Sequence, residues 1–161
     1  KKQMKKYLIE FIGTFFLVLV IGLTGGNAMA PIAIGSILMG LVYMGGPVSG
    51  AMYNPAVTLA ILIRKKISTG DALIYMVFQI LGATAAAFLY YLIFGNTFAP
   101  KPNPTINILK PLAIEILFTF ALSLVVEVFH WKCPLLSLAI TSSTYVFHSL
   151  QDGHLPIHLP L

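Results

Sequence analysis

The sequence has 161 residues, of which 58% are apolar and only 9% are charged, and its formal net charge is +5. A soluble domain needs more polar surface than this, so we predict a single integral membrane domain over residues 1–161. The basic residues cluster beside apolar runs, which indicates membrane orientation rather than nucleic-acid binding, and a lone cysteine, Cys133, excludes an internal disulfide framework.

Apolar runs separated by glycine, proline and capping residues predict five spans that cross a lipid bilayer. We place them at residues 7–24, 31–45, 72–94, 111–129 and 134–150, followed by a divergent tail at 149–161. The Gly46-Pro47 pair is expected to end the second span, so that a loop occupies residues 45–50.

Between the second and third spans lies a short apolar segment, residues 54–63, which stops at Arg64-Lys65-Lys66. Asn54 is a favoured N-cap and Pro55 a favoured first helical residue, so together they predict a helix start. Ten residues rise about 15 Å, roughly half of a hydrocarbon core of about 30 Å. The basic end belongs at the water interface, so the helix start points at the bilayer midplane. The segment is therefore predicted to be a re-entrant half-helix whose polar start adjoins protein or a water-filled cavity.

The basic residues also predict an orientation, because cytoplasmic segments carry an excess of Lys and Arg. With a cytoplasmic N-terminus, the outside loops hold only Lys101 and Lys110. The inside segments hold the others: Lys1, Lys2, Lys5, Lys6, Arg64, Lys65, Lys66 and Lys132. We expect this arrangement in the plasma membrane.

A faint internal repeat joins the first and fourth spans. Residues 10–17 and 115–122 share Glu, Thr, Phe and Leu at one constant offset. The second copy lies three spans after the first, an odd displacement, so the copies would run in opposite directions through the membrane. That is typical of an inverted-topology repeat, which builds a pore or carrier about a midplane site.

The stretch from Gly46 to Ala60, GPVSGAMYNPAVTLA, resembles the first signature of the aquaporins, the major intrinsic protein channels. Three further groups fit the family's first, third and fourth helices: Glu10 with Gly13-Thr14-Phe15, Gln79 with Leu81-Gly82-Ala83, and Glu115 with Thr119-Phe120. The resemblance covers residues 7 to about 148. It implies an all-α integral membrane fold, an inverted-repeat helical bundle of six spans and two re-entrant half-helices. Such proteins usually assemble as homotetramers with one pore per subunit, which we expect here if the chain is complete.

The resemblance also implies roles for individual residues. In the pore motif Asn54-Pro55-Ala56, the Asn54 amide would donate to permeating water, and the carbonyls of Gly50, Ala51 and Met52 would lead to it. Met52 stands where the family usually has His, a change that leaves the backbone carbonyl in place.

The resemblance further assigns residues to the selectivity constriction and to loop support. Ile34 and His148 would occupy constriction positions, and Glu10 and Glu115 would brace the half-helix loops. Each histidine or aliphatic assignment has an ordinary alternative: His148 as an interfacial side chain, and Ile34 as a core or lipid-facing one.

After His148 the family pattern stops. By the family's spacing, a second Asn-Pro-Ala is expected near residues 159–161, which read Leu-Pro-Leu. The second half-helix, the sixth span and the constriction arginine are therefore absent from this sequence, and residues 151–158 resemble no part of the family.

The leading hypothesis for function is a passive channel for water and small neutral solutes, embedded in the lipid bilayer. We predict no enzyme, because no acid and base pair, nucleophile, metal constellation or cofactor motif is present. A glycerol-type facilitator is the nearest alternative, since aliphatic Ile34 favours it and His148 favours water. A non-conducting, truncated channel-derived subunit or gene remnant is another, and we expect the 161-residue chain alone to conduct water poorly. For Asn54-Pro55 an ordinary capped connector is the plain alternative.

Overall fold

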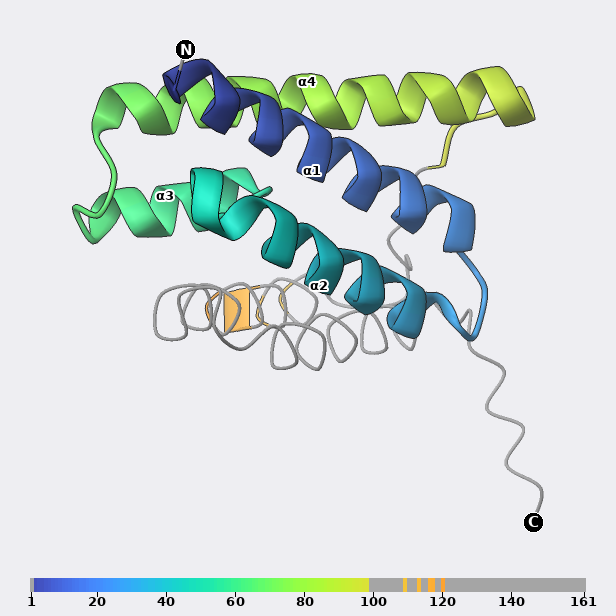
Figure 1. Ribbon diagram of the computed structural model, residues 1–161. Coiled ribbons are helices and arrows are strands. Elements are labelled where there is room, and N and C mark those ends of the chain that lie inside the picture. Colours follow the sequence, from blue (N-terminus) through green and yellow to red (C-terminus); the bar gives the residue numbers. More distant parts are fainter. Residues whose placement is uncertain (1, 99–108, 110–112, 114–115, 118–119, 121–161) are drawn as a thin grey trace.

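The computed structural model describes residues 2–98, 109, 113, 116–117 and 120 (Figure 1). All regular structure in these residues is helical, in agreement with the predicted all-α class. The four helices are α1 (Lys2–Thr24), α2 (Ala30–Ser49), α3 (Pro55–Ile63) and α4 (Thr69–Phe94). The predicted span at 111–129 is described only at its helical residues 113, 116, 117 and 120, and the span at 134–150 and the tail lie outside the described residues.

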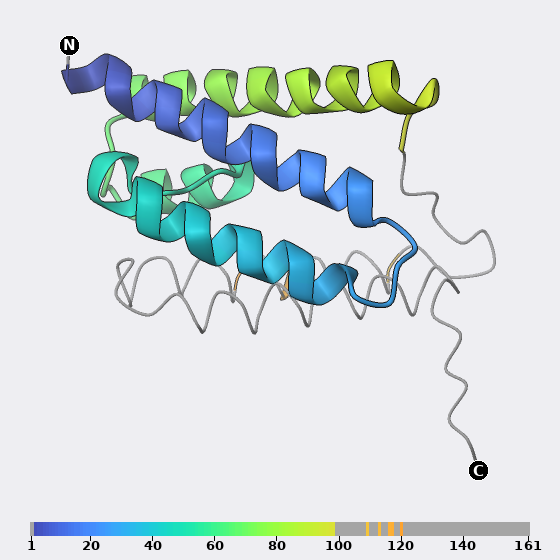
Figure 2. The same cartoon turned by 45° about the vertical axis from the view of Figure 1, so that its right-hand side comes forward.

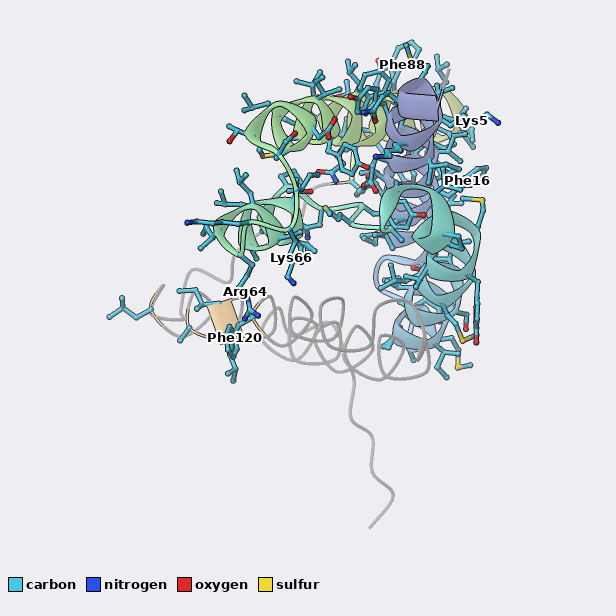
Figure 3. The ribbon with its side chains drawn as sticks, turned by 60° about the vertical axis from the view of Figure 1, so that its left-hand side comes forward. Lys5, Phe16, Arg64, Lys66, Phe88 and Phe120 are labelled. Atoms are coloured by element: carbon cyan, nitrogen blue, oxygen red, sulfur yellow. The ribbon has the colours of Figure 1, made fainter. Side chains whose placement is uncertain are left out.

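Three of these helices, α1, α2 and α4, are long and apolar enough to cross a membrane. The nine residues of α3 rise only about 14 Å, so this helix can enter a bilayer but cannot cross it. The side chains of Phe16 on α1 and Phe88 on α4 point away from the bundle, where lipid would meet them (Figure 3).

Helix α4 has well-defined ends that come from its own sequence. The Ser68 side chain accepts a hydrogen bond from the Asp71 amide at 3.1 Å, which makes Ser68 the N-cap and starts the helix three residues before the expected position. At the other end, Gly95 adopts a left-handed conformation (φ 70°) and its amide donates to the Tyr91 carbonyl at 2.8 Å.

The end of α2 differs from the prediction. The helix continues through Gly46-Pro47 to Ser49, so most of the expected loop at 45–50 is helical. Pro47 has no amide to donate to the carbonyl four residues earlier, and the helix continues for only two residues after it. Gly50, at φ 95°, closes the helix by donating its amide to the Gly46 carbonyl at 3.1 Å.

Helix α3 begins as predicted. Asn54 is extended, its side-chain oxygen accepts from the Ala56 amide at 2.8 Å, and Pro55 is the first helical residue. At the far end Lys65 takes a positive φ of 57°, and its amide donates to the Leu62 carbonyl at 2.8 Å. This is a Schellman-type ending, which returns the chain toward α4.

In the bundle, α1 lies between α4 and α2 (Figure 1). The loop after α2 runs back into the bundle and α3 returns to the end where α2 finished, so the segment is re-entrant (Figure 2). Tyr7 donates to Asp71 at 2.8 Å, which ties the start of α1 to the start of α4. Helices α1 and α4 approach closely at Gly82, where an added Cβ would lie 3.2 Å from the Phe15 backbone nitrogen.

Candidate functional site

The loop between α2 and α3 has an unusual backbone. Gly50, Ala51 and Tyr53 all have positive φ, at 95°, 53° and 49°, and Asn54 is extended. A residue with a Cβ rarely adopts positive φ, so the surrounding contacts must hold Ala51 and Tyr53 in place.

Those contacts use the amide groups of the loop. The Ala51 amide donates to the Ser49 hydroxyl at 3.1 Å. The next two amides reach the Glu10 carboxylate on α1: Met52 donates to Oε1 at 3.1 Å and Tyr53 to Oε2 at 2.7 Å. Three consecutive donors are thus directed to one side of the loop.

Glu10 is the centre of a buried polar junction, with no exposed surface in the structure. Besides the two amides, it accepts from the Ser49 hydroxyl at 2.6 Å and from the Gln79 amide group at 2.8 Å. An ionised carboxylate accepts about four hydrogen bonds, and four donors from α2, the loop and α4 surround this one. Glu10 therefore links α1 to the loop, α2 and α4 through these four hydrogen bonds. The bracing role that the family resemblance implied for it stays a prediction.

The carbonyl groups of the loop behave differently from its amides. Tyr53 O accepts from the Thr14 hydroxyl at 3.2 Å, and Ser49 O accepts from the Tyr75 hydroxyl at 3.0 Å. Between them, no donor in the part of the chain that the structure describes reaches the carbonyls of Gly50, Ala51 or Met52. The role of these three carbonyls as a ladder of acceptors, which the family resemblance implies, stays a prediction.

Asn54 is the last residue of this loop and the N-cap of α3. Its Oδ1 is engaged by the Ala56 amide, and its backbone oxygen accepts from the Thr58 amide at 2.9 Å. Among the described residues, nothing accepts from its Nδ2, which lies at the positive end of the α3 dipole. Its role as a pore donor stays a prediction. Pro55 and Ala56 are exposed beside it.

A second set of contacts supports Asn54 from α4. Gln79, which is 1% exposed, donates to the Thr58 hydroxyl at 2.9 Å as well as to Glu10. The Thr58 hydroxyl lies 3.0 Å from the Asn54 carbonyl oxygen. From the sequence, Gln79 was predicted only as a family match, and no role was predicted for Thr58, Ser49 or Tyr53. Polar residues inside apolar runs were the signal that could have found the first two of these.

Two further predicted positions have different outcomes. Ile34 is 2% exposed on the buried face of α2, in line with Ala30 and Leu38, and its constriction role stays a prediction. Glu115 and His148 lie outside the described residues.

Comparison with known proteins places the sequence in a family. The family model described as "Major intrinsic protein" matches residues 1–133. The chain is 43% identical over 94 residues to "Glycerol uptake facilitator protein-like 6" of Lactiplantibacillus plantarum, covering 52% of this chain and 41% of that protein.

Other relatives carry aquaporin names. "Aquaporin-5" of Mus musculus is 40% identical over 101 residues, covering 58% of this chain and 36% of the relative. "Aquaporin AqpM" of Methanothermobacter thermautotrophicus is 31% identical over 157 residues, covering 76% and 63%. The chain spans about half the length of the curated relatives it matches. The chain belongs to the major intrinsic protein family, a family of passive membrane channels and not of enzymes.

Proposed function

We propose that this chain forms one wall of a passive pore for water and small neutral solutes. One observation carries the proposal: the carbonyls of Gly50, Ala51 and Met52 lack donors within the described residues, and the Nδ2 donor of Asn54 follows them. The amides of Ala51, Met52 and Tyr53 donate instead to the side chains of Ser49 and Glu10. The loop thus offers a permeating molecule acceptors along its length and a donor at its end.

Transport needs no chemistry in this arrangement. A water molecule would donate to successive carbonyls and then accept from Asn54 Nδ2, so it exchanges bulk hydrogen bonds for equivalent ones. The first turn of α3 directs its dipole's positive end at the same point, which raises the free energy of protons and cations there. Pro55 has no amide to compete at this point, and Asn54 Nδ2 would orient the molecule as a side-chain donor.

A glycerol-type facilitator is the second candidate. It is favoured by the 43% identity to a protein named as a glycerol uptake facilitator and by aliphatic, buried Ile34 at the constriction position that the family resemblance implies. Glycerol is amphipathic, and an aliphatic wall opposite a row of carbonyls suits both of its faces.

Stopped-flow light scattering on proteoliposomes tests the proposal. The protein is expressed from its gene with any residues continuous with this chain, and vesicle shrinkage is followed after a sucrose jump and after a glycerol jump. We expect rapid protein-dependent water flux with a low activation energy. Glycerol flux as fast as water flux would favour the second candidate. Rates equal to empty vesicles in both assays would contradict both and favour the non-conducting alternative.

Two substitutions at Asn54 test its place in the pore. Asn54→Asp keeps the helix cap but puts a carboxylate near the midplane, where a charge costs at least about 2.5 kcal/mol. We expect it to reduce water flux more than Asn54→Ala does and to raise cation or proton leak. Parental flux without added leak in Asn54→Asp would show that the residue is remote from the pore.

We further propose that the N-terminus and residues 64–66 face the cytoplasm in the plasma membrane, on the basis of the charge asymmetry. Cysteines placed at Lys66 and Lys101 in a Cys133→Ser background should react with an impermeant reagent from opposite sides. Labelling from one side would contradict this topology. By family resemblance we also propose a homotetramer, which native mass measurement in detergent would test.

A further inference from the structure

Tyr53, the residue before Asn54, is held from every direction. It is 2% exposed, its amide donates to Glu10, its carbonyl accepts from Thr14, and its hydroxyl donates to the Leu41 carbonyl of α2 at 2.7 Å. Its backbone has positive φ, a conformation that residues with a Cβ rarely adopt. A strained residue that uses both backbone groups and its side chain on neighbouring helices is over-determined by its surroundings.

The ring of Tyr53 occupies a notch made by two glycines, Gly13 on α1 and Gly45 on α2. A Cβ built at Gly13 would overlap the Tyr53 ring, and a Cβ built at Gly45 would overlap its hydroxyl. The notch therefore exists only because both helices have glycine there. The three atoms nearest to a Cβ built at Gly13 all belong to the Tyr53 ring.

The position of the ring fixes the chain at the pore. Asn54 is anchored on its far side by α3, through the Ala56 amide and Thr58. On its near side it is joined to Tyr53. Because Asn54 Oδ1 is engaged, the direction of its Nδ2 follows from the backbone direction at these two residues.

We propose that Tyr53 is a positioning residue for Asn54: its ring, seated between Gly13 and Gly45, sets where the Asn54 amide points in the pore, an inference that rests on the proposed function. Glu10 holds the loop amides, whereas Tyr53 sets the depth at which the loop stops between α1 and α2. The side chain acts through Asn54 and does not itself touch the solute.

A size exchange between Gly13 and Tyr53 tests this. Gly13→Ala overfills the notch and should displace the ring, lowering water flux per folded protein by about tenfold. Adding Tyr53→Leu removes the ring edge that the new methyl group meets, so the double variant should recover to within about threefold of the parent. Tyr53→Phe keeps the ring and should give no recovery when combined with Gly13→Ala.

Two glycines provide matched controls. A Cβ at Gly40 meets nothing within 4 Å, so Gly40→Ala should leave flux unchanged. A Cβ at Gly82 meets the α1 backbone at Phe11 and Phe15 instead of Tyr53, so Tyr53→Leu should not rescue Gly82→Ala. Equal rescue of both glycine variants would mean that Tyr53→Leu only loosens the bundle, and would overturn the proposal.

A second readout does not depend on flux. In a Cys133→Ser background, the labelling rate of Ala56→Cys by a small thiol reagent reports the start of α3, and Lys66→Cys reports its end. Gly13→Ala should change the rate at position 56 by about tenfold, Tyr53→Leu should reverse that change, and the rate at 66 should stay constant. Absence of reversal would overturn the role of Tyr53. If the parent gave no flux in either assay the proposed function would fail, and this labelling cycle would still decide whether Tyr53 sets the loop.

Discussion

Two buried regions hold the re-entrant loop, and they use opposite chemistry. The polar junction consists of side chains from α1, α2, α3 and α4: Glu10, Ser49, Thr58 and Gln79. The apolar cluster lies between α2 and the loop and is formed by Leu38, Leu41, Val42, Ala51 and Tyr53. The junction determines which way the loop amides point, and the cluster determines how deep the loop sits.

The membrane changes how much each of these two regions contributes to the free energy of unfolding. In water the apolar cluster would gain free energy from transfer out of solvent, but lipid tails are as apolar as leucine, so only packing remains. The groups of the polar junction cannot exchange their hydrogen bonds for bonds to water, and each unsatisfied group costs several kcal/mol in hydrocarbon. We therefore expect the usual ranking in a soluble core to be reversed here.

The largest effect should come from removing the centre of the polar junction. Glu10→Ala removes the acceptor of four hydrogen bonds, three of them buried and one part-buried, at about 1–3 kcal/mol each, so it should cost about 4 kcal/mol or more. Loss of the monodisperse peak in detergent and a collapse of the thermal unfolding midpoint would show this. Glu10→Gln, which keeps the size but directs an amide donor at other donors, should fall between parent and Glu10→Ala. A stable Glu10→Ala variant would break the comparison.

Gly82→Ala should come next, because it tests backbone packing and belongs to neither region. The added methyl group meets the backbone of α1, which cannot move like a side chain, and overpacking costs about 1–3 kcal/mol. The unfolding midpoint measures it, with Gly40→Ala as the control that should be neutral or slightly stabilising. Equal behaviour of the two glycine variants would mean that α1 and α4 are not in close contact there.

The apolar cluster should be less sensitive. Leu38→Ala opens a cavity beside Leu41 and Val42, but in lipid it forfeits packing without the transfer term, so we expect about 1–2 kcal/mol, below the roughly 2–5 kcal/mol of a soluble core. The same unfolding assay measures this. A loss greater than that of Glu10→Ala would reverse the ranking of the two regions.

The smallest loss of stability should come from a substitution at Thr58, a peripheral member of the polar junction. Thr58→Val keeps the shape but removes the hydroxyl that accepts from Gln79, and should cost about 1 kcal/mol. Water flux should fall only modestly, because the Asn54 cap and the Glu10 contacts persist. A loss as large as that of Glu10→Ala would show that Gln79 acts mainly through Thr58.

Sequence reasoning succeeded where the cause is local. Asn54 followed by Pro55 starts a helix through contacts within three residues, and the stop at residues 64–66 is local too, so α3 was predicted nearly to the residue. The end of α2 was predicted too early, because Gly46-Pro47 looks like a helix breaker. The helix instead continues to Ser49, where Gly50 caps it in a left-handed conformation.

The partners inside the bundle required the tertiary structure. Glu10 meets the Met52 amide and Gln79 from positions 42 and 69 residues away in sequence, and no local pattern specifies such pairings. Likewise, nothing in the sequence distinguishes Tyr53 from the other aromatic residues. Only the structure shows that its ring lies between Gly13 and Gly45.

The sequence by itself therefore determined the membrane class and the approximate positions of helices α1 to α4, because hydropathy, caps and charge act over short distances. The family followed from the resemblance of its motifs. Only the tertiary structure decided which loop groups have hydrogen-bond partners among the described residues and which do not. That division depends on Glu10 and Tyr53 meeting α2, α4 and the loop in space, and a buried carboxylate accepts from whichever donors the packing brings to it.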